Sequence, residues 1–175
     1  MKHELLEALA GYPVFTAREV ADALGKKMDY AYLVAHRLKK AGALQEIEKG
    51  KYAAGKDPFA VASWIAWPSY ISCWAALNYY GLTEQLPFTI HVITTRKRKN
   101  RTLTFQNARV EFIKVRKEAF FGFERRAYQN TEIFIAEKEK ALVDAVALGK
   151  MSVAEAAEIV LNNGGNMNRR RLFSY

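Results

Sequence analysis

Hydrophobic and polar positions in residues 1–56 follow a helical period in three segments and then alternate. In residues 2–10 the leucines fall on one face, which predicts a short amphipathic helix. Thr16 and Glu19 have the spacing of a capping box, and Gly25 is typical of a helix C-cap. We therefore expect a second short helix between these two signals.

A third helix is predicted from an N-cap near Asp29 to Ala41, because apolar residues recur there at helical spacing. Residues 44–53 then alternate in polarity around Lys49-Gly50, which predicts a short hairpin. Three helices followed by a two-stranded hairpin are typical of a winged helix-turn-helix.

In that motif the third helix enters the major groove of DNA and the hairpin lies against the backbone. The polar residues around the predicted helix and hairpin are the candidate DNA contacts: Lys26, Lys27, Tyr30, Tyr32, His36, Arg37, Lys39, Lys40, Lys49 and Lys51. Tyr, His and Arg can reach base edges, whereas lysines suit phosphates. A helical domain that binds protein is the alternative. The net charge of residues 1–56 is only +3, which predicts modest affinity and favours a homodimer or two copies on repeated sites.

Residues 54–58 form a turn-like junction, at which Asp57 and Pro58 suit the N-cap and first position of a helix. The sequence therefore predicts two domains, a winged helix at 1–56 and an α+β domain at 57–175.

The stretch 58–83 carries no charge and is long enough to cross a bilayer. Its polar residues and Pro68 favour two short buried helices, broken at Trp67-Pro68-Ser69. We expect no membrane span and, without a visible signal peptide, a cytoplasmic protein.

Beyond residue 88 the pattern predicts an α+β domain with a small antiparallel sheet and flanking helices. Strands are expected at 89–95, 103–105, 109–115 and 133–135, and helices at 137–148 and from the capping box at Ser152 to Leu161. Glu137, Glu139 and Asp144 alternate with lysines, which is typical of a solvated helix face.

The charge of the chain is concentrated in the second domain. The whole chain has a formal net charge of +9, and residues 96–126 alone carry +8. A second basic surface is therefore expected, formed by Arg96, Lys97, Arg98, Lys99, Arg101, Lys114 and Arg116. Its partner is nucleic acid or an acidic protein; alternatively the charges maintain solubility and protect a strand edge.

The single cysteine, Cys73, excludes an internal disulfide and sites built from several cysteines. We expect this cysteine to be buried. The same expectation holds for Trp64, Trp67 and Trp74. The chain has no metal-binding histidine pair, no Glu-x-Lys triplet, no phosphate-binding Gly-rich loop and no Gly-x-Ser-x-Gly elbow. We expect a protein without metal, cofactor or enzymatic activity.

Several segments resemble the AbiEi-type antitoxins of type IV toxin–antitoxin systems. They are Tyr70-Ile71-Ser72 with residues 76–82, the strand and basic tip at 92–98, Phe120-Phe121-Gly122, and residues 135–144. The resemblance implies a winged helix that binds its own operator as a repressor. It also implies a second domain that counters a nucleotidyltransferase-like toxin without forming an obligatory stable complex. Compared with that family, the C-terminal part looks short or cut.

The alternative hypothesis is a protein- or RNA-binding adaptor that uses the basic face 96–126. In that case the winged helix would serve protein contacts, and the basic face would meet the toxin or its RNA substrate.

Overall fold

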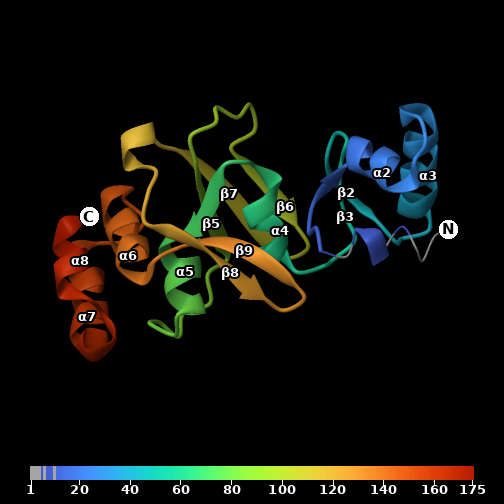
Figure 1. The fold of residues 1–175 in the computed structure, drawn as a ribbon. Helices are drawn as coiled ribbons and strands as arrows, with labels where there is room; N and C mark the ends of the chain where they lie inside the picture. The colour runs from blue at the N-terminus through green and yellow to red at the C-terminus, as the bar shows by residue number, and fades with distance from the viewer. Residues whose placement is uncertain (1–4, 6, 10) are drawn as a thin grey trace.

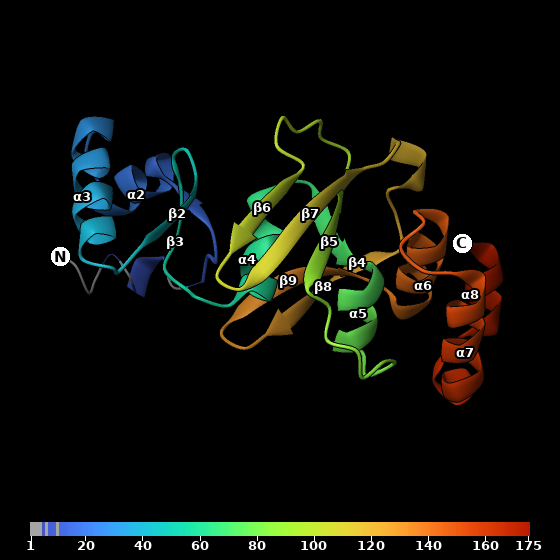
Figure 2. The same ribbon diagram turned by 180° about the vertical axis from the view of Figure 1, so that it is seen from behind.

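The computed structural model describes residues 5, 7–9 and 11–175 and has an α+β fold with two sheets (Figures 1 and 2). The predicted helix 2–10 falls largely outside the described residues. Leu5 and Leu9, which are described, are buried.

The first sheet is antiparallel and has the strand order β1-β3-β2. Its strands are β1 (Phe15–Thr16), β2 (Gln45–Glu48) and β3 (Lys51–Ala53), and the helices beside it are α2 (Ala17–Leu24) and α3 (Met28–Lys40). The predicted hairpin is confirmed, and its turn lies at residues 49–50, where Gly50 has a φ of 75°.

The predicted ends of α2 are confirmed. The Thr16 hydroxyl accepts from the Glu19 N–H, the Glu19 carboxylate accepts from the Thr16 N–H at 2.6 Å, and Gly25 is left-handed. The predicted N-cap of α3 is wrong, because Lys27 occupies that position without a side-chain bond. Asp29 lies in the first turn, where its negative charge suits the helix dipole.

The second sheet has six strands in the order β6-β7-β5-β4-β9-β8. The strands are β4 (Ser69–Ser72), β5 (Thr89–Thr94), β6 (Thr102–Phe105), β7 (Ala108–Lys114), β8 (Phe123–Tyr128) and β9 (Thr131–Ala136). Its α-helices are α4 (Pro58–Ile65), α5 (Cys73–Tyr79), α6 (Lys138–Ala147), α7 (Val153–Asn163) and α8 (Arg169–Ser174), and its 3-10 helices are η1 (Lys117–Ala119) and η2 (Gly164–Asn166).

The predicted antiparallel sheet is confirmed only in part. The pairs β4–β5, β6–β7 and β8–β9 are antiparallel, whereas β5 pairs with β7 and β4 with β9 in parallel, so the sheet is mixed. The prediction of two helices joined by a break is also corrected, since the break at Trp67-Pro68-Ser69 leads into the strand β4. All four residues of β4 are buried, so the strand has no polar face to mark it in the sequence. The strand β8 was not predicted.

The two faces of β4 carry different helices. Ser69 donates to the carbonyl of Ser63 in α4, whereas Tyr70 and Ser72 donate to Asp144 in α6. Because side chains alternate along a strand, α4 and α6 cover opposite faces of the sheet. Asp57 caps α4 as predicted, accepting from the Phe59 N–H at 2.8 Å.

Two hydrophobic clusters form the interior. The smaller joins residues between Leu5 and Tyr52, and the larger joins the second sheet with its helices and includes Val14 and Ala53. Cys73 is buried as predicted, and burial raises the pKa of its thiol to about 12. Trp64 and Trp74 are half-buried, but Trp67 is 61% exposed, so its expected place in the core is wrong. No helix within the described residues has the length and apolar character needed to span a bilayer.

Candidate nucleic-acid interface

The helix α3 packs one side against the smaller hydrophobic cluster and exposes the other. Ala31, Val34, Ala35 and Leu38 are buried, as the predicted apolar stripe required. Tyr32, which is 50% exposed, lies on the outer side together with His36 and Arg37. This side combines a phenol, an imidazole and a guanidinium group, which can contact base edges.

Five cations around α3 and the hairpin are exposed and have no ion pair with any described residue. They are Lys26, Lys27, Arg37, Lys40 and Lys49. Tyr30 is only half-buried but packs against the smaller cluster, so part of its ring belongs to the interior.

Lys39 forms an ion pair with another residue of the protein. Its ammonium group lies 2.5 Å from a carboxylate oxygen of Glu46 on β2. The hydrogen bond from Lys39, followed by the backbone N–H of Gly50, lowers the pKa of Glu46. The pair fixes α3 to the hairpin and neutralises one acidic residue of the hairpin.

Lys51, one of the candidate DNA contacts of the hairpin, makes contacts within the protein. Its ammonium group donates to the carbonyl oxygen of Ile65 in α4 at 2.5 Å and lies 3.4 Å from Glu48. This lysine therefore ties the hairpin to α4, and Lys49 is the lysine at the turn.

Arg98 makes the corresponding contact from the second sheet. Its guanidinium pairs with Glu48 on β2 and lies 4.0 Å from the ring centre of Phe112 on β7. Gln106 also donates to the side chain of Gln45 at 2.9 Å. Arg98 therefore links the loop to the hairpin, and its charge is not free to contact a partner as the second basic surface would require.

The other cations of the loop 95–101 remain exposed: Arg96, Lys97, Lys99 and Arg101. With Lys114 and Lys150, three of these line a cavity of about 290 Å³ beside β7, in which Glu111 supplies the one carboxylate. Arg116 is exposed beyond the end of β7, where it precedes η1. Lys114 is the last residue of β7, so these two members of the second basic surface do not share a strand.

The hairpin turn and the loop 95–101, which both carry candidate DNA contacts, lie close to one end of α3 (Figures 1 and 2). Figures 1 and 2 show the β2–β3 turn and the loop between β5 and β6 at the same upper edge, which α3 also approaches. The Arg98–Glu48 pair joins the hairpin and the loop directly. The structure thus brings the second basic surface next to the predicted DNA-binding residues, which sequence spacing alone did not indicate.

His91 on β5 belongs to a further group of charged side chains, with Glu111 and Lys150. Its Nε2 atom lies 3.4 Å from Glu111, which accepts from Lys150 at 3.0 Å. Burial lowers the pKa of His91, and the charge of Lys150 adds to this, whereas Glu111 opposes it. Within the described part of the chain, no three His, Cys, Asp or Glu side chains gather closely enough to hold a metal ion.

A buried polar cluster was missed by the sequence analysis. Lys140 and Asp144, one turn apart on α6, form an ion pair and are 4% and 6% exposed. Ser72 donates to the same carboxylate at 2.8 Å and Tyr70 at 3.2 Å. The expectation of a solvated face is therefore wrong for these residues and for Glu139, which is 1% exposed.

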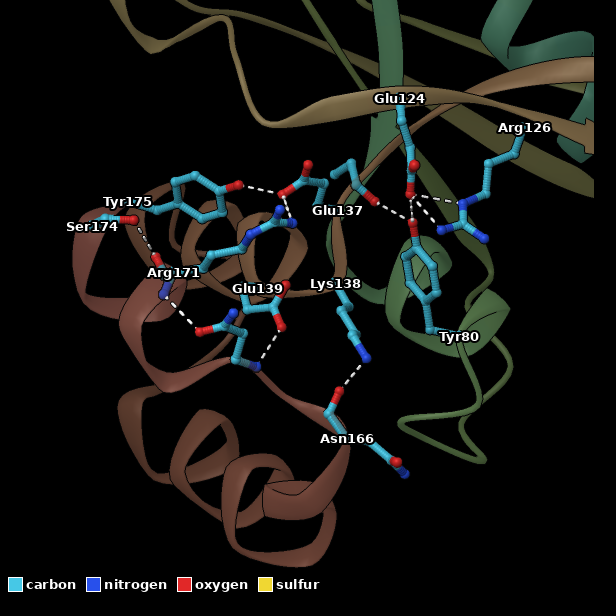
Figure 3. A network of polar contacts seen from close by, with 12 residues as sticks. Tyr80, Glu124, Arg126, Glu137, Lys138, Glu139, Asn166, Arg171, Ser174 and Tyr175 are labelled. Atoms are coloured by element: carbon cyan, nitrogen blue, oxygen red, sulfur yellow. Dashed lines mark hydrogen bonds and ion pairs between the residues drawn. The ribbon is translucent and has the colours of Figure 1, made fainter.

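A second network attaches the C-terminal helix α8 to α6 (Figure 3). Arg171 lies 2.9 Å from Glu137, which also accepts from Tyr175, and Glu139 accepts from the Asn168 N–H at 2.7 Å. Arg171 is thus used in packing, while Arg169 and Arg170 remain exposed.

No protein-family model matches this chain, and no curated protein matches it.

Proposed function

We propose that this protein is a DNA-binding transcriptional autorepressor with an N-terminal winged helix. The observation that carries the proposal is the contact of the β2–β3 hairpin with the basic loop 95–101 through the Arg98–Glu48 pair, close to α3 with its exposed cations (Figure 1). The three-stranded sheet β1-β3-β2 beside α2 and α3 supports the winged-helix interpretation, in which β2 and β3 form the wing.

The charge balance of this side supports nucleic acid as the partner. Glu46 and Glu48, the acidic residues of the hairpin, are neutralised by Lys39, Lys51 and Arg98. The hairpin carboxylates are therefore paired, and the exposed cations Arg37, Lys40, Lys97 and Lys99 have no ion pair with a described residue. Such cations release counterions from DNA and supply affinity that falls steeply with salt.

We further propose that the protein is an antitoxin of the AbiEi type, acting against a nucleotidyltransferase-like toxin. The segments that carry the resemblance support this by their positions in space. Tyr70 of the first segment stacks on Phe123 with ring centres 4.6 Å apart, beside the Phe-Phe-Gly segment. Lys140 of the last segment lies 4.9 Å from the ring centre of Phe121. Three segments distant in sequence thus surround one buried ion pair.

A gel-shift titration against the DNA upstream of its own gene tests the repressor proposal. We expect specific binding that weakens steeply between low and moderate salt, and competition by unrelated DNA only at large excess. Equal affinity for unrelated DNA would contradict the proposal. The same titration on one and two half-sites reports whether a dimer binds.

An adaptor for RNA or protein is the second candidate, favoured by the exposed cations around the 290 Å³ cavity. Co-expression with the toxin separates the two functions. If replacing Lys97, Lys99 and Arg101 by Gln abolishes protection while operator binding is unchanged, the loop serves the adaptor function.

A further inference from the structure

A cavity of about 720 Å³ lies where the N-terminal part of the chain meets the second sheet. Val14, Phe15 and Thr16 line it on one side, and residues of α4, β8 and β9 line it on the other. The volume falls in the range of sites that hold small organic ligands, and such sites occur preferentially between packed units.

Aromatic side chains form one wall of this cavity. The ring of Trp67 lies 4.8 Å from that of Phe134, and Phe134 lies 5.8 Å from Trp64. Trp64 is held in place by a hydrogen bond of 2.6 Å from its indole N–H to the carbonyl of Glu132. Trp67 lies against this group yet remains 61% exposed, so a large part of its ring surface has no partner among the described residues.

Cations surround the aromatic wall. Lys51, Arg96 and Arg125 line the cavity, whereas Glu19 is its single carboxylate. Glu19 is occupied in the capping box, because one of its oxygens accepts from the Thr16 N–H at 2.6 Å and from the Thr16 hydroxyl at 2.8 Å.

Of the three cations, Arg96 is the one available for a ligand. Lys51 donates to Ile65, and Arg125 pairs with Glu132. The guanidinium of Arg96 is exposed and makes no hydrogen bond or ion pair with any described side chain. The cavity thus offers an aromatic surface and one free guanidinium, with an excess of positive charge.

We propose that this cavity binds a small planar aromatic anion, whose ring packs on Trp67 and whose anionic group pairs with Arg96. Aromatic rings stack on tryptophan, and a guanidinium matches carboxylate or phosphate geometry. A nucleoside monophosphate and an aromatic carboxylate share this chemistry.

A ligand in this cavity would also affect DNA binding, which rests on the proposed function. Arg96 also lines the basic cavity beside β7 and belongs to the loop next to the hairpin. A bound anion would remove its charge from the DNA-contacting side, so the ligand would weaken DNA binding. Binding of the ligand itself does not depend on DNA.

The test is a titration of the full chain with adenosine 5′-monophosphate, with 4-hydroxybenzoate and with neutral adenosine, followed by calorimetry and tryptophan fluorescence. We expect at least one of the two anions to bind saturably and adenosine to bind much more weakly. The anion that binds shows whether the ligand is a nucleotide or an aromatic carboxylate. Trp67→Ala and Arg96→Gln should each weaken binding about tenfold or more.

Matched variants keep the result specific. Trp74→Phe removes a tryptophan outside the cavity, and Lys99→Gln removes a charge from the same loop, so both should bind as the unchanged protein does. Absence of saturable binding by both anions at millimolar concentration, equal binding of adenosine, or full binding by the Trp67 and Arg96 variants would overturn the inference. If the unchanged protein binds the anion but no DNA, the proposed function fails and this inference stands.

Discussion

Lys140 and Asp144 place opposite charges inside the protein, and every oxygen of the carboxylate is used. Asp144 accepts from Lys140, Tyr70 and Ser72. Burial, together with the charge of Asp144, raises the pKa of Tyr70, so its hydroxyl keeps its proton and donates. Such hydrogen bonds offset the cost of removing the charges from water.

Asp144→Asn should destabilise the protein by about 3–5 kcal/mol, because the Lys140 charge would stay buried without its counter-ion. Urea unfolding measures this loss. The matched control is Glu132→Gln, whose pair with Arg125 has side chains 42% and 61% exposed. That change should cost at most about 1 kcal/mol. Equal losses in the two variants would show that the buried pair has no special role.

His91 should make stability depend on pH in the mildly acidic range. Burial lowers its pKa in the folded state, so folding favours the neutral ring. This contribution is fully present above the unfolded pKa of about 6.5 and is lost as pH falls toward the folded value.

His91→Gln should therefore flatten the decrease in unfolding free energy between about pH 6.5 and pH 5, by at most about 1.4 kcal/mol per pH unit. Urea unfolding at several pH values measures the slope. Glu111 acts in the same direction, but its lowered pKa places its effect at more acidic pH. An unchanged slope in the variant would exclude His91 as the titrating group.

At the scale of elements, local signals position the helices that display the candidate interface. The capping boxes at Thr16 and Ser152 are both formed, because their bonds join residues three positions apart. The apolar stripe of α3 determines which side faces the smaller cluster and therefore which side remains exposed.

Arg37→Ala and Lys49→Ala should affect DNA binding differently. Arg37 lies on the exposed side of α3, so its loss should cost about 1–3 kcal/mol for the operator and relax the sequence preference. Lys49 lies at the turn of the hairpin, so its loss should weaken all DNA sequences alike. Gel shifts with operator and scrambled DNA measure both effects. A uniform loss for Arg37→Ala would place that residue on phosphate.

At the scale of the whole molecule, the loop that carries much of the excess charge of the second part of the chain contacts the hairpin. The pair of Arg98 with Glu48 holds the loop 95–101 beside the hairpin, and the bond from Lys51 to Ile65 holds the hairpin against α4. We therefore expect one extended phosphate-contacting surface in place of two separate ones.

Lys97→Gln with Lys99→Gln should reduce the dependence of log K on log salt by roughly 2, since each lost phosphate contact lowers the slope by about 0.9. DNA titrations across salt concentrations measure it. The control is Arg169→Gln with Arg170→Gln, which removes the same charge from α8, at the opposite end of the molecule from α3 (Figure 1). If both pairs change the slope equally, only net charge matters.

The sequence by itself determined the elements whose signals are local. Both ends of α2, the starts of α4 and α7, the hairpin turn and the strands β5, β6 and β7 follow from caps, glycines and alternation within a few residues. The concentration of charge at 96–126 was likewise visible. Each of these depends on neighbours along the chain, so no tertiary contact was needed to predict it.

Only the tertiary structure decided the features that join distant residues. The strand β4 is buried on both faces, so its apolar run could not be distinguished from a helix by periodicity. The charged residues of α6 appeared solvated until Tyr70 and Ser72 supplied their partners about 70 positions away. Sheet order, the burial of Lys140 and the position of Arg98 against Glu48 all depend on long-range packing, which leaves no periodic signal in the sequence.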